Sequence, residues 1–212
     1  MSRRTPKTSG RIRNIIFDIG GVLVNFDYDI ILRRLAHQSP LTVGEIRACI
    51  IDSPEHRDFD KGRISGPQFH AFVVRKIHLN MNYGQFFEAW SDMFWPEDPM
   101  LNLASVLGDR YELHLLSNTD EIHYTEFRQL HRLTELTPRW GLSFKLGAMK
   151  PEVAIFERFL QQFHLRSAES IFIDDLAENV RGARRAGLHA IHHTSLPSTR
   201  RSLGRFGILA SP

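Results

Sequence analysis

Residues 12–21 read Ile-Arg-Asn-Ile-Ile-Phe-Asp-Ile-Gly-Gly, a short apolar run that indicates the fold class. The run is rich in β-branched residues and is stopped by two glycines, so we predict a buried strand that ends at Asp18. Three later short runs are similar in length and apolar character, at residues 111–116, 170–173 and 189–193. The chain therefore carries the pattern of several short buried strands separated by long connections.

Helical periodicity fills the connections between the later strands, at residues 99–107, 151–163 and 177–186. Pro151 stands where a first-turn proline is expected, and Gly187 stands where a helix-ending glycine is expected. Strands that alternate with helices predict an α/β fold with a doubly wound, Rossmann-like parallel sheet. The residues after Ser195 look like a loop.

The stretch from residue 27 to residue 96 differs from the rest, because it is long and nearly free of strand patterns. Helical periodicity is plausible at residues 30–37, 43–51, 67–77 and 83–94. We therefore predict a helical subdomain inserted after the first strand. The expected division is an α/β core (12–26 and 97–212), a helical cap (27–96) and a flexible basic tail (1–11).

The composition is that of an ordinary globular protein, with 42% apolar and 24% charged residues in 212. A single cysteine, Cys49, excludes an internal disulfide and favours a reducing, cytoplasmic location. No apolar run approaches the roughly 20 residues needed to cross a bilayer, and the basic residues 1–11 are not followed by an apolar stretch of signal-peptide type. We expect no membrane partner.

The formal net charge of +3 raises the question of nucleic-acid binding. The basic residues are dispersed, with small clusters at Arg3–Arg4, Arg184–Arg185 and Arg200–Arg201. No long basic stripe with interleaved aromatic residues is present. We therefore predict a solvated basic surface and no nucleic-acid partner.

Polar residues follow three of the predicted strands: Asp18, then Ser117-Asn118-Thr119, then Asp174-Asp175. Ligands of open parallel sheets bind outside the carboxyl ends of the strands, so these groups should converge on one crevice. Lys150, before a predicted helix, adds a cation. Each feature alone is ordinary, but adjacent carboxylates such as the Asp174-Asp175 pair repel one another unless a cation neutralises them. The four features in this order are far less expected by chance.

These segments resemble the motifs of the haloacid dehalogenase (HAD) superfamily. The matching residues are Phe-Asp-Ile-Gly-Gly-Val-Leu (17–23), Leu-Leu-Ser-Asn-Thr (115–119), Lys-Pro (150–151) and Ile-Phe-Ile-Asp-Asp-Leu-Ala-Glu-Asn (171–179). The resemblance covers about residues 12–193. The insert matches the position of the family's mobile cap, which would close over the crevice and exclude water.

The resemblance implies a phosphatase in which Asp18 is the nucleophile and forms an aspartyl-phosphate. It implies a Mg²⁺ cofactor, held by the Asp18 carboxylate, the Gly20 carbonyl and Asp175 with help from Asp174. The metal would offset the repulsion between the nucleophile and the phosphate. Asn179 is expected to support this metal site.

The same resemblance implies a phosphate-binding group. Ser117 and the Asn118 backbone N–H would clamp phosphate oxygens, and Lys150 would steady Asp18 and the transferring group. Gly20 and Gly21 would also contact the substrate. The expected catalytic residues are thus Asp18, Ser117 and Lys150.

The cap segment Phe-Asp-Lys-Gly-Arg-Ile-Ser (59–65) resembles bacterial sugar-phosphate phosphatases similar to α-D-glucose-1-phosphate phosphatase. The expected partner is a small phosphorylated metabolite such as glucose 1-phosphate. Candidate substrate contacts in the cap are His56, Arg57, Lys61 and Arg63, and a solvated charged face is the simpler alternative. Trp90, Phe94 and Trp95 either line the pocket or pack the cap onto the core. Because core and cap can bury one another, we expect a monomer.

Gly20 is a departure, because most phosphatases of the superfamily carry a second aspartate there that protonates the leaving oxygen. The loss of a general acid typically costs about 10²- to 10⁴-fold in rate. Either the leaving group is good, as in an anomeric phosphate, or another group such as Asp27 or a water substitutes, or activity is slow or lost. Gly20 counts against a phosphomutase. A metal-independent haloacid dehalogenase and a binding or regulatory module remain as alternatives.

Overall fold

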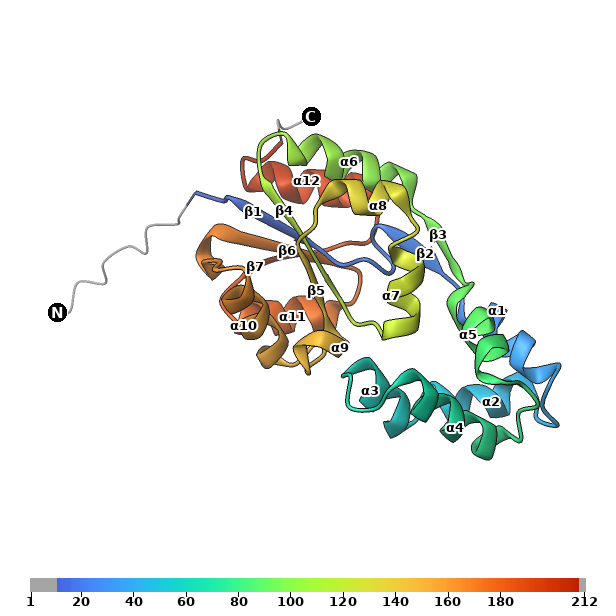
Figure 1. The fold of residues 1–212 in the computed structure, drawn as a ribbon. Coiled ribbons are helices and arrows are strands. Elements are labelled where there is room, and N and C mark those ends of the chain that lie inside the picture. The colour runs from blue at the N-terminus through green and yellow to red at the C-terminus, as the bar shows by residue number, and fades with distance from the viewer. Residues whose placement is uncertain (1–10, 210–212) are drawn as a thin grey trace.

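A computed structural model describes residues 11–209 of the chain. Its centre is a sheet of five parallel strands in the order β5-β4-β1-β6-β7 (Figure 1). The strands are β1 (Asn14–Phe17), β4 (Glu112–Ser117), β5 (Trp140–Leu142), β6 (Ser170–Asp174) and β7 (His189–His192). Phe17 at the end of β1 pairs with Leu115 on one side and Ile173 on the other, so three strands end side by side. The predicted α/β fold is confirmed.

Helices cover both faces of this sheet, which explains why its strands are apolar throughout. Ile15 and Phe17 pack into one fully buried cluster, and Ile16, between them, packs into another on the opposite face. The first face is covered by α6 (Asp98–Gly108), α8 (His131–Leu136) and α12 (Leu196–Arg205), and the second by α10 (Val153–Gln162) and α11 (Ala177–Arg185) (Figure 1). Each such buried side chain contributes about 1.5–3 kcal/mol.

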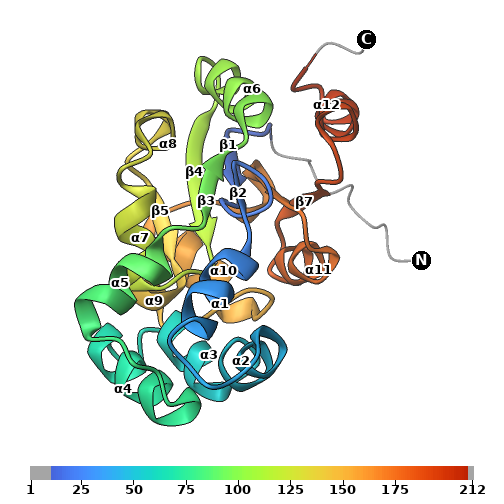
Figure 2. The ribbon, with the colours of Figure 1, turned by 90° about the vertical axis from the view of Figure 1, so that its right-hand side faces the viewer.

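The insert folds as five helices around an apolar cluster of its own, in which Phe69 and Trp90 are fully buried. They are α1 (Tyr28–Ala36), α2 (Val43–Ile50), α3 (Pro54–Asp60), α4 (Gly66–Ile77) and α5 (Tyr83–Ser91). Thr42 and Asn82 form capping boxes that start α2 and α5. The helices lie together at one end of the sheet (Figure 2). There, α5 contacts α7 (Glu121–Phe127), and α3 contacts α9 (Ser143–Leu146).

Both connections between core and insert pass through a two-stranded antiparallel ribbon. Its strands are β2 (Val24–Phe26) and β3 (Phe94–Pro96). The helix expected at residues 83–94 therefore ends earlier, at Ser91, because Phe94 pairs with Phe26 across the ribbon. The ribbon brings the two ends of the insert side by side.

Two further expectations about secondary structure are wrong. The residues after Ser195 form α12, whose first turn is capped by Ser195 and whose Leu203 is fully buried. Its three arginines are exposed, and its apolar side is too short to give a clear helical pattern in the sequence. Pro151 lies outside the next helix, which begins at Val153. The sequence patterns also missed α3, α7, α8, α9 and β5, all of which are short.

Residues 1–10 and 210–212 lie outside the described range, and with them most of the predicted basic tail and the Arg3–Arg4 cluster. Within residues 11–209, no helix has the length and apolar character to traverse a bilayer. Cys49 is half-buried and packs against the apolar cluster of the insert.

Candidate active site

The carboxyl ends of β1, β4 and β6 meet, as their order in the sheet requires, and their polar residues surround one cavity of about 230 Å³. Six residues singled out from the sequence line it: Asp18, Gly20, Ser117, Asn118, Lys150 and Asp175. Asn179, expected in a supporting role, lines it as well. Segments far apart in the chain thus contribute to one site at the end of the sheet that faces the insert (Figure 1).

Lys150 is the centre of the charged groups at the core end of this cavity. Its Nζ lies 2.6 Å from Oδ1 of Asp18 and 2.8 Å from Oδ2 of Asp174. The same Nζ is 3.3 Å from the carbonyl oxygen of Leu116, and the residue is only 3% exposed. Such a buried ion pair persists only with good geometry and additional hydrogen bonds, and both are present here.

The backbone of Lys150 is held by the side chain of Asn118. The Lys150 N–H donates to Asn118 Oδ1 at 2.8 Å, and Asn118 Nδ2 donates to the Lys150 carbonyl at 2.9 Å. This reciprocal pair joins the loop after β4 to the loop before α10. It explains how a lysine so distant in sequence reaches Asp18 in a fixed position.

Three carboxylates gather beside the lysine. Oxygen atoms of Asp18, Asp174 and Asp175 all lie within 4.8 Å of one another. Asp174 is oriented by the Leu176 N–H at 2.8 Å and by Asn179 Nδ2 at 3.0 and 3.1 Å. One ammonium for three carboxylates leaves excess negative charge, and clustered hard oxygen ligands suit a divalent cation such as Mg²⁺.

The electrostatics of these groups reflect that excess. Burial raises the pKa of Asp18 well above its ordinary value, against the opposing effect of Lys150. Burial alone would also raise the pKa of Asp174, but Lys150 and the Leu176 N–H hold it below the usual range. Burial and the neighbouring Asp174 raise the pKa of Asp175. A bound divalent cation would favour the ionised form of all three.

The turn after β1 is built to bring the backbone close to Asp175. Gly21 has φ +74°, and a Cβ there would lie 2.4 Å from Oδ2 of Asp175. Only glycine fits this conformation and this approach. Gly21 itself does not line the cavity, so its expected contact with the substrate finds no support, whereas Gly20 does line it, next to Phe26.

The four charged residues expected to contact substrate from the insert do not line the cavity. His56 is only 5% exposed and packs against Phe69 and Trp90, because it faces into the apolar centre of the insert. The other three are turned to solvent or to ion pairs, with Arg57 exposed, Lys61 paired to Glu152 and Arg63 paired to Asp58.

Other residues that the sequence patterns missed do line the cavity: Phe26, Tyr28, Asp60, Met149 and Leu176. Tyr28 and Asp60 come from α1 and α3 of the insert. No motif pointed to them, because their approach to Asp18 depends on how the insert packs on the core.

The structure also shows the surroundings of Asp27 and of the aromatic residues for which the sequence left alternatives open. Asp27 is exposed and caps α1 by accepting from the Asp29 N–H at 2.8 Å, so it gives no support to a role as proton donor. Trp90 is fully buried and packs the insert, and Phe94 packs against both apolar clusters. Trp95 neither lines the cavity nor packs the insert onto the core, because it is 46% exposed on the ribbon.

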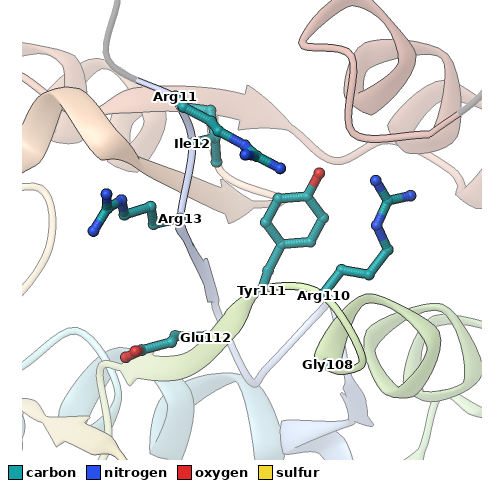
Figure 3. A pocket seen from close by; sticks show the side chains of 7 residues that line it. All are labelled: Arg11, Ile12, Arg13, Gly108, Arg110, Tyr111 and Glu112. Carbon is teal, nitrogen blue, oxygen red and sulfur yellow. The ribbon is translucent and has the colours of Figure 1, made fainter.

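A larger hollow, of about 520 Å³, lies at the opposite end of the sheet, where β1 and β4 begin (Figure 3). Arg11, Arg13 and Arg110 surround Tyr111 there, next to Glu112. Among the described residues that line it, there is no cluster of carboxylates and no pair of nucleophile and cation. We therefore locate the chemistry in the smaller cavity around Asp18.

No family model matches the chain, but comparison with known proteins finds phosphatases of similar sequence. A D-ribitol-5-phosphate phosphatase from Bacteroides thetaiotaomicron is 27% identical over 189 residues, covering 83% of this chain and 89% of that protein. A sesquiterpene phosphatase from Aspergillus oryzae is 26% identical, covering 87% of this chain and 91% of its own.

Solved structures share the whole fold. A predicted HAD-like family hydrolase from Porphyromonas gingivalis matches with a TM-score of 0.78 and 27% identity, covering 92% of this chain and 98% of that one. A HAD family enzyme from Bacteroides thetaiotaomicron matches with a TM-score of 0.79 and 22% identity, covering 92% and 100%. Its wild-type complex with magnesium and inorganic phosphate matches with a TM-score of 0.71 and 21% identity, covering 85% and 93%. With its motifs gathered at the strand ends of a shared fold, the chain resembles the HAD-like hydrolases in both sequence and structure.

Proposed function

We propose that the protein is a Mg²⁺-dependent phosphatase that hydrolyses a small phosphomonoester through an aspartyl-phosphate on Asp18. One observation carries the proposal: Lys150 binds both Asp18 and Asp174 at the end of the sheet, beside a third carboxylate, Asp175. Two relatives that are phosphatases, at 27% and 26% identity, support the reaction class. The magnesium and phosphate complex of a structural neighbour supports the metal.

Asp18 is positioned for attack on phosphorus. Its Oδ1 accepts from Lys150 Nζ at 2.6 Å and from the Ile19 N–H at 2.7 Å, which fixes the orientation of the carboxylate. Attack in line with the leaving oxygen splits the hydrolysis into formation and breakdown of an acyl phosphate. Prior orientation of a nucleophile removes much of the entropic part of the barrier.

Groups of the chain itself would hold the phosphate. The Ser117 hydroxyl and the Asn118 backbone N–H can donate to phosphate oxygens, and Lys150 places positive charge at the same point. Ser117 is 2% exposed and lines the cavity, so a phosphate bound there would be shielded from bulk water. Donors fixed in place before the reaction stabilise the charge that develops during transfer.

Asp18, Asp175 and the Gly20 carbonyl would hold Mg²⁺. When bound, the metal supplies positive charge that offsets the repulsion between the Asp18 carboxylate and the phosphate. Asp174 is already engaged by Lys150 and Asn179, so we assign it mainly the positioning of that lysine and of its neighbour Asp175. These carboxylates favour a phosphatase over a metal-independent dehalogenase.

The substrate would be small, because the cavity of about 230 Å³ is bordered by residues of the insert, which we regard as a cap. Apolar side chains such as Phe26 and Met149 and polar ones such as Tyr28 and Asp60 both line it. A sugar phosphate or sugar-alcohol phosphate fits this mixture of surfaces. Glucose 1-phosphate and D-ribitol 5-phosphate, the latter suggested by a relative's activity, are the first substrates to examine.

The test is phosphate release from a panel of phosphomonoesters with and without Mg²⁺, with Asp18→Asn as the reference. We expect metal-dependent release by the wild type and a loss on the order of 10⁴-fold or more in the variant, the scale reported for removing a nucleophile. A thermal melt of both proteins checks that the fold is retained. Turnover by Asp18→Asn at the wild-type rate would falsify the assignment of the nucleophile.

A further inference from the structure

A second acidic group reaches the cavity from the insert. Asp60 is the last residue of α3, and its half-buried side chain lines the same cavity as Asp18 and Gly20. Within residues 11–209, neither an ion pair nor a side-chain hydrogen bond holds the Asp60 carboxyl group. Asp60 is thus an acid without a fixed partner in the cavity that Gly20 also lines, and the core itself carries no acid at position 20.

One neighbour of Asp60 is a buried histidine. One ring nitrogen of His56 and one carboxylate oxygen each of Asp60 and Asp120 lie within 4.8 Å of one another. His56 Nδ1 is 3.0 Å from the Ile51 carbonyl oxygen, which accepts a hydrogen bond from it. Its Nε2 is buried and has no hydrogen-bond partner among residues 11–209. His56 therefore does not hold the Asp60 carboxyl group by a hydrogen bond.

Asp120, the other neighbour, is already saturated. Its Oδ1 accepts the N–H groups of Ile122 and His123 at 2.8 and 2.9 Å. Its Oδ2 accepts from Trp90 Nε1 at 3.0 Å and lies 2.9 Å from Nδ1 of His123. A carboxylate with four hydrogen-bonding partners stays ionised, and both of its oxygens are already occupied by donors, which leaves no room for a metal ion. We therefore do not interpret His56, Asp60 and Asp120 as a metal site.

These contacts set the protonation of Asp60. Burial, together with the charge of Asp120, raises its pKa to about 6, although His56 and His123 act in the opposite direction. The groups that face Asp60 are His56 on its own helix, Asp120 and His123 at the start of α7, and Tyr28 on α1. Asp60 can therefore give up and regain a proton near neutral pH, which suits a general acid and base.

We propose that Asp60 is the proton donor to the leaving oxygen, in place of the acid that the core lacks at Gly20; this rests on the function proposed above. As Asp18 bonds to phosphorus, the bond between phosphorus and the leaving oxygen breaks. The electron pair goes to that oxygen, which takes the proton from Asp60. In the second step the Asp60 carboxylate takes a proton from water as the water oxygen attacks phosphorus, and the bond to Asp18 breaks.

The experiment compares two esters in Asp60→Asn. p-Nitrophenyl phosphate has a leaving group that needs no proton, whereas β-glycerophosphate releases an alkoxide that does. We expect kcat/KM for the alkyl ester to fall about 10²- to 10⁴-fold and that for the aryl ester to change by less than about 10-fold. The ratio of the two rates is measured on one sample, so it does not depend on how much of the variant folds.

The matched control is Asp58→Asn, on the same helix. Asp58 is paired with the exposed Arg63 and does not line the cavity, so both esters should be turned over as by the wild type. Asp60→Glu keeps an acid and should recover part of the alkyl-ester activity. The pH profile adds a second readout. The alkyl-ester kcat/KM of the wild type should decline above about pH 6, and this decline should be absent in Asp60→Asn.

The outcomes separate the two proposals. Equal losses on both esters in Asp60→Asn, or no loss on either, overturn the role of Asp60 while leaving the phosphatase intact. A wild-type protein that releases no phosphate from any ester with Mg²⁺ overturns the proposed function, and the role of Asp60 with it. A selective loss on the alkyl ester, together with complete loss on both in Asp18→Asn, supports both.

Discussion

The two ends of the cavity hold buried charge in different ways. At the core end, Lys150 lies between two carboxylates at 2.6 and 2.8 Å, and its charge does not depend on pH in the neutral range. At the insert end, Asp120 is stabilised by His123 and Trp90, while Asp60 has no cation of its own. A permanent charge suits a group that orients a nucleophile, and a titrating group suits proton transfer. The contrast suggests a division of labour between core and insert.

Removing the cation of the core end should have the largest effect. Lys150→Met leaves Asp18 and Asp174 buried without a cation, which typically costs about 3–5 kcal/mol. We expect this loss in the free energy of unfolding, measured with urea, together with loss of phosphate release. A variant as stable and as active as the wild type would show that Lys150 does not neutralise these carboxylates.

Removing the charge of His123 at the insert end should cost less free energy of unfolding, and this cost should depend on pH. Burial lowers the pKa of His123, but Asp120 outweighs that effect and raises it, so the folded state favours the charged form. The stability from this pair is fully present below the unfolded-state pKa of about 6.5 and is lost as pH rises through the higher folded-state value. We expect His123→Phe to cost about 1.5–3 kcal/mol at pH 6 and less at pH 9.

The measurement is urea unfolding of wild type and His123→Phe across this pH range. The phenylalanine ring preserves the stacking on Trp90, whose ring centroid lies 5.6 Å from that of His123, and removes the charge and the ring-nitrogen contacts to Asp120 and the Trp90 carbonyl. A cost that grew with pH would contradict the assignment of a charged His123.

Gly21→Ala tests the close approach at the core end without removing a charge. The residue would be forced to keep φ +74° with a methyl group 2.4 Å from Asp175 Oδ2. We expect a loss of about 1–3 kcal/mol in the free energy of unfolding and weaker activation by Mg²⁺. The concentration of Mg²⁺ that gives half-maximal activity is the readout, and an unchanged value would separate Gly21 from the metal site.

The smallest effect is expected where neither end of the cavity is involved. Ser195→Ala removes the cap of α12, which covers the sheet far from Asp18, and should cost about 1 kcal/mol. Phosphate release should be unchanged. A loss of phosphate release in this variant would mean that reduced stability alone lowers turnover. The activity losses of the other variants would then have to be corrected for their reduced stability.

The sequence predicted the core end well because its groups are tied to strand ends. Once β1, β4 and β6 are expected to be parallel neighbours, Asp18, Ser117 and Asp174 must converge. The turn glycines and the lysine before a helix belong to the same local patterns. Only the exact partners of Lys150, including the carbonyl of Leu116, required the structure.

The insert end was predicted poorly because its helices are set by packing and not by a shared edge. His56, Lys61 and Arg63 were selected for their charge, yet α3 turns His56 inward, and the other two, which follow that helix, are held in ion pairs. Asp60, beside them, is the side chain that reaches the cavity. If α3 were rotated about its axis by one residue, a different side chain would reach the cavity. Helical periodicity in the sequence does not specify this rotation.

From the sequence alone follow the α/β class, the position of the insert and the chemistry gathered at the strand ends, because alternating strands and polar strand ends are local patterns. Tertiary structure decided which side of α3 faces Asp18, where α12 packs and which buried carboxylates have partners. These depend on contacts between segments far apart in the chain, and burial and neighbouring charge, not residue type, then set how each carboxylate titrates.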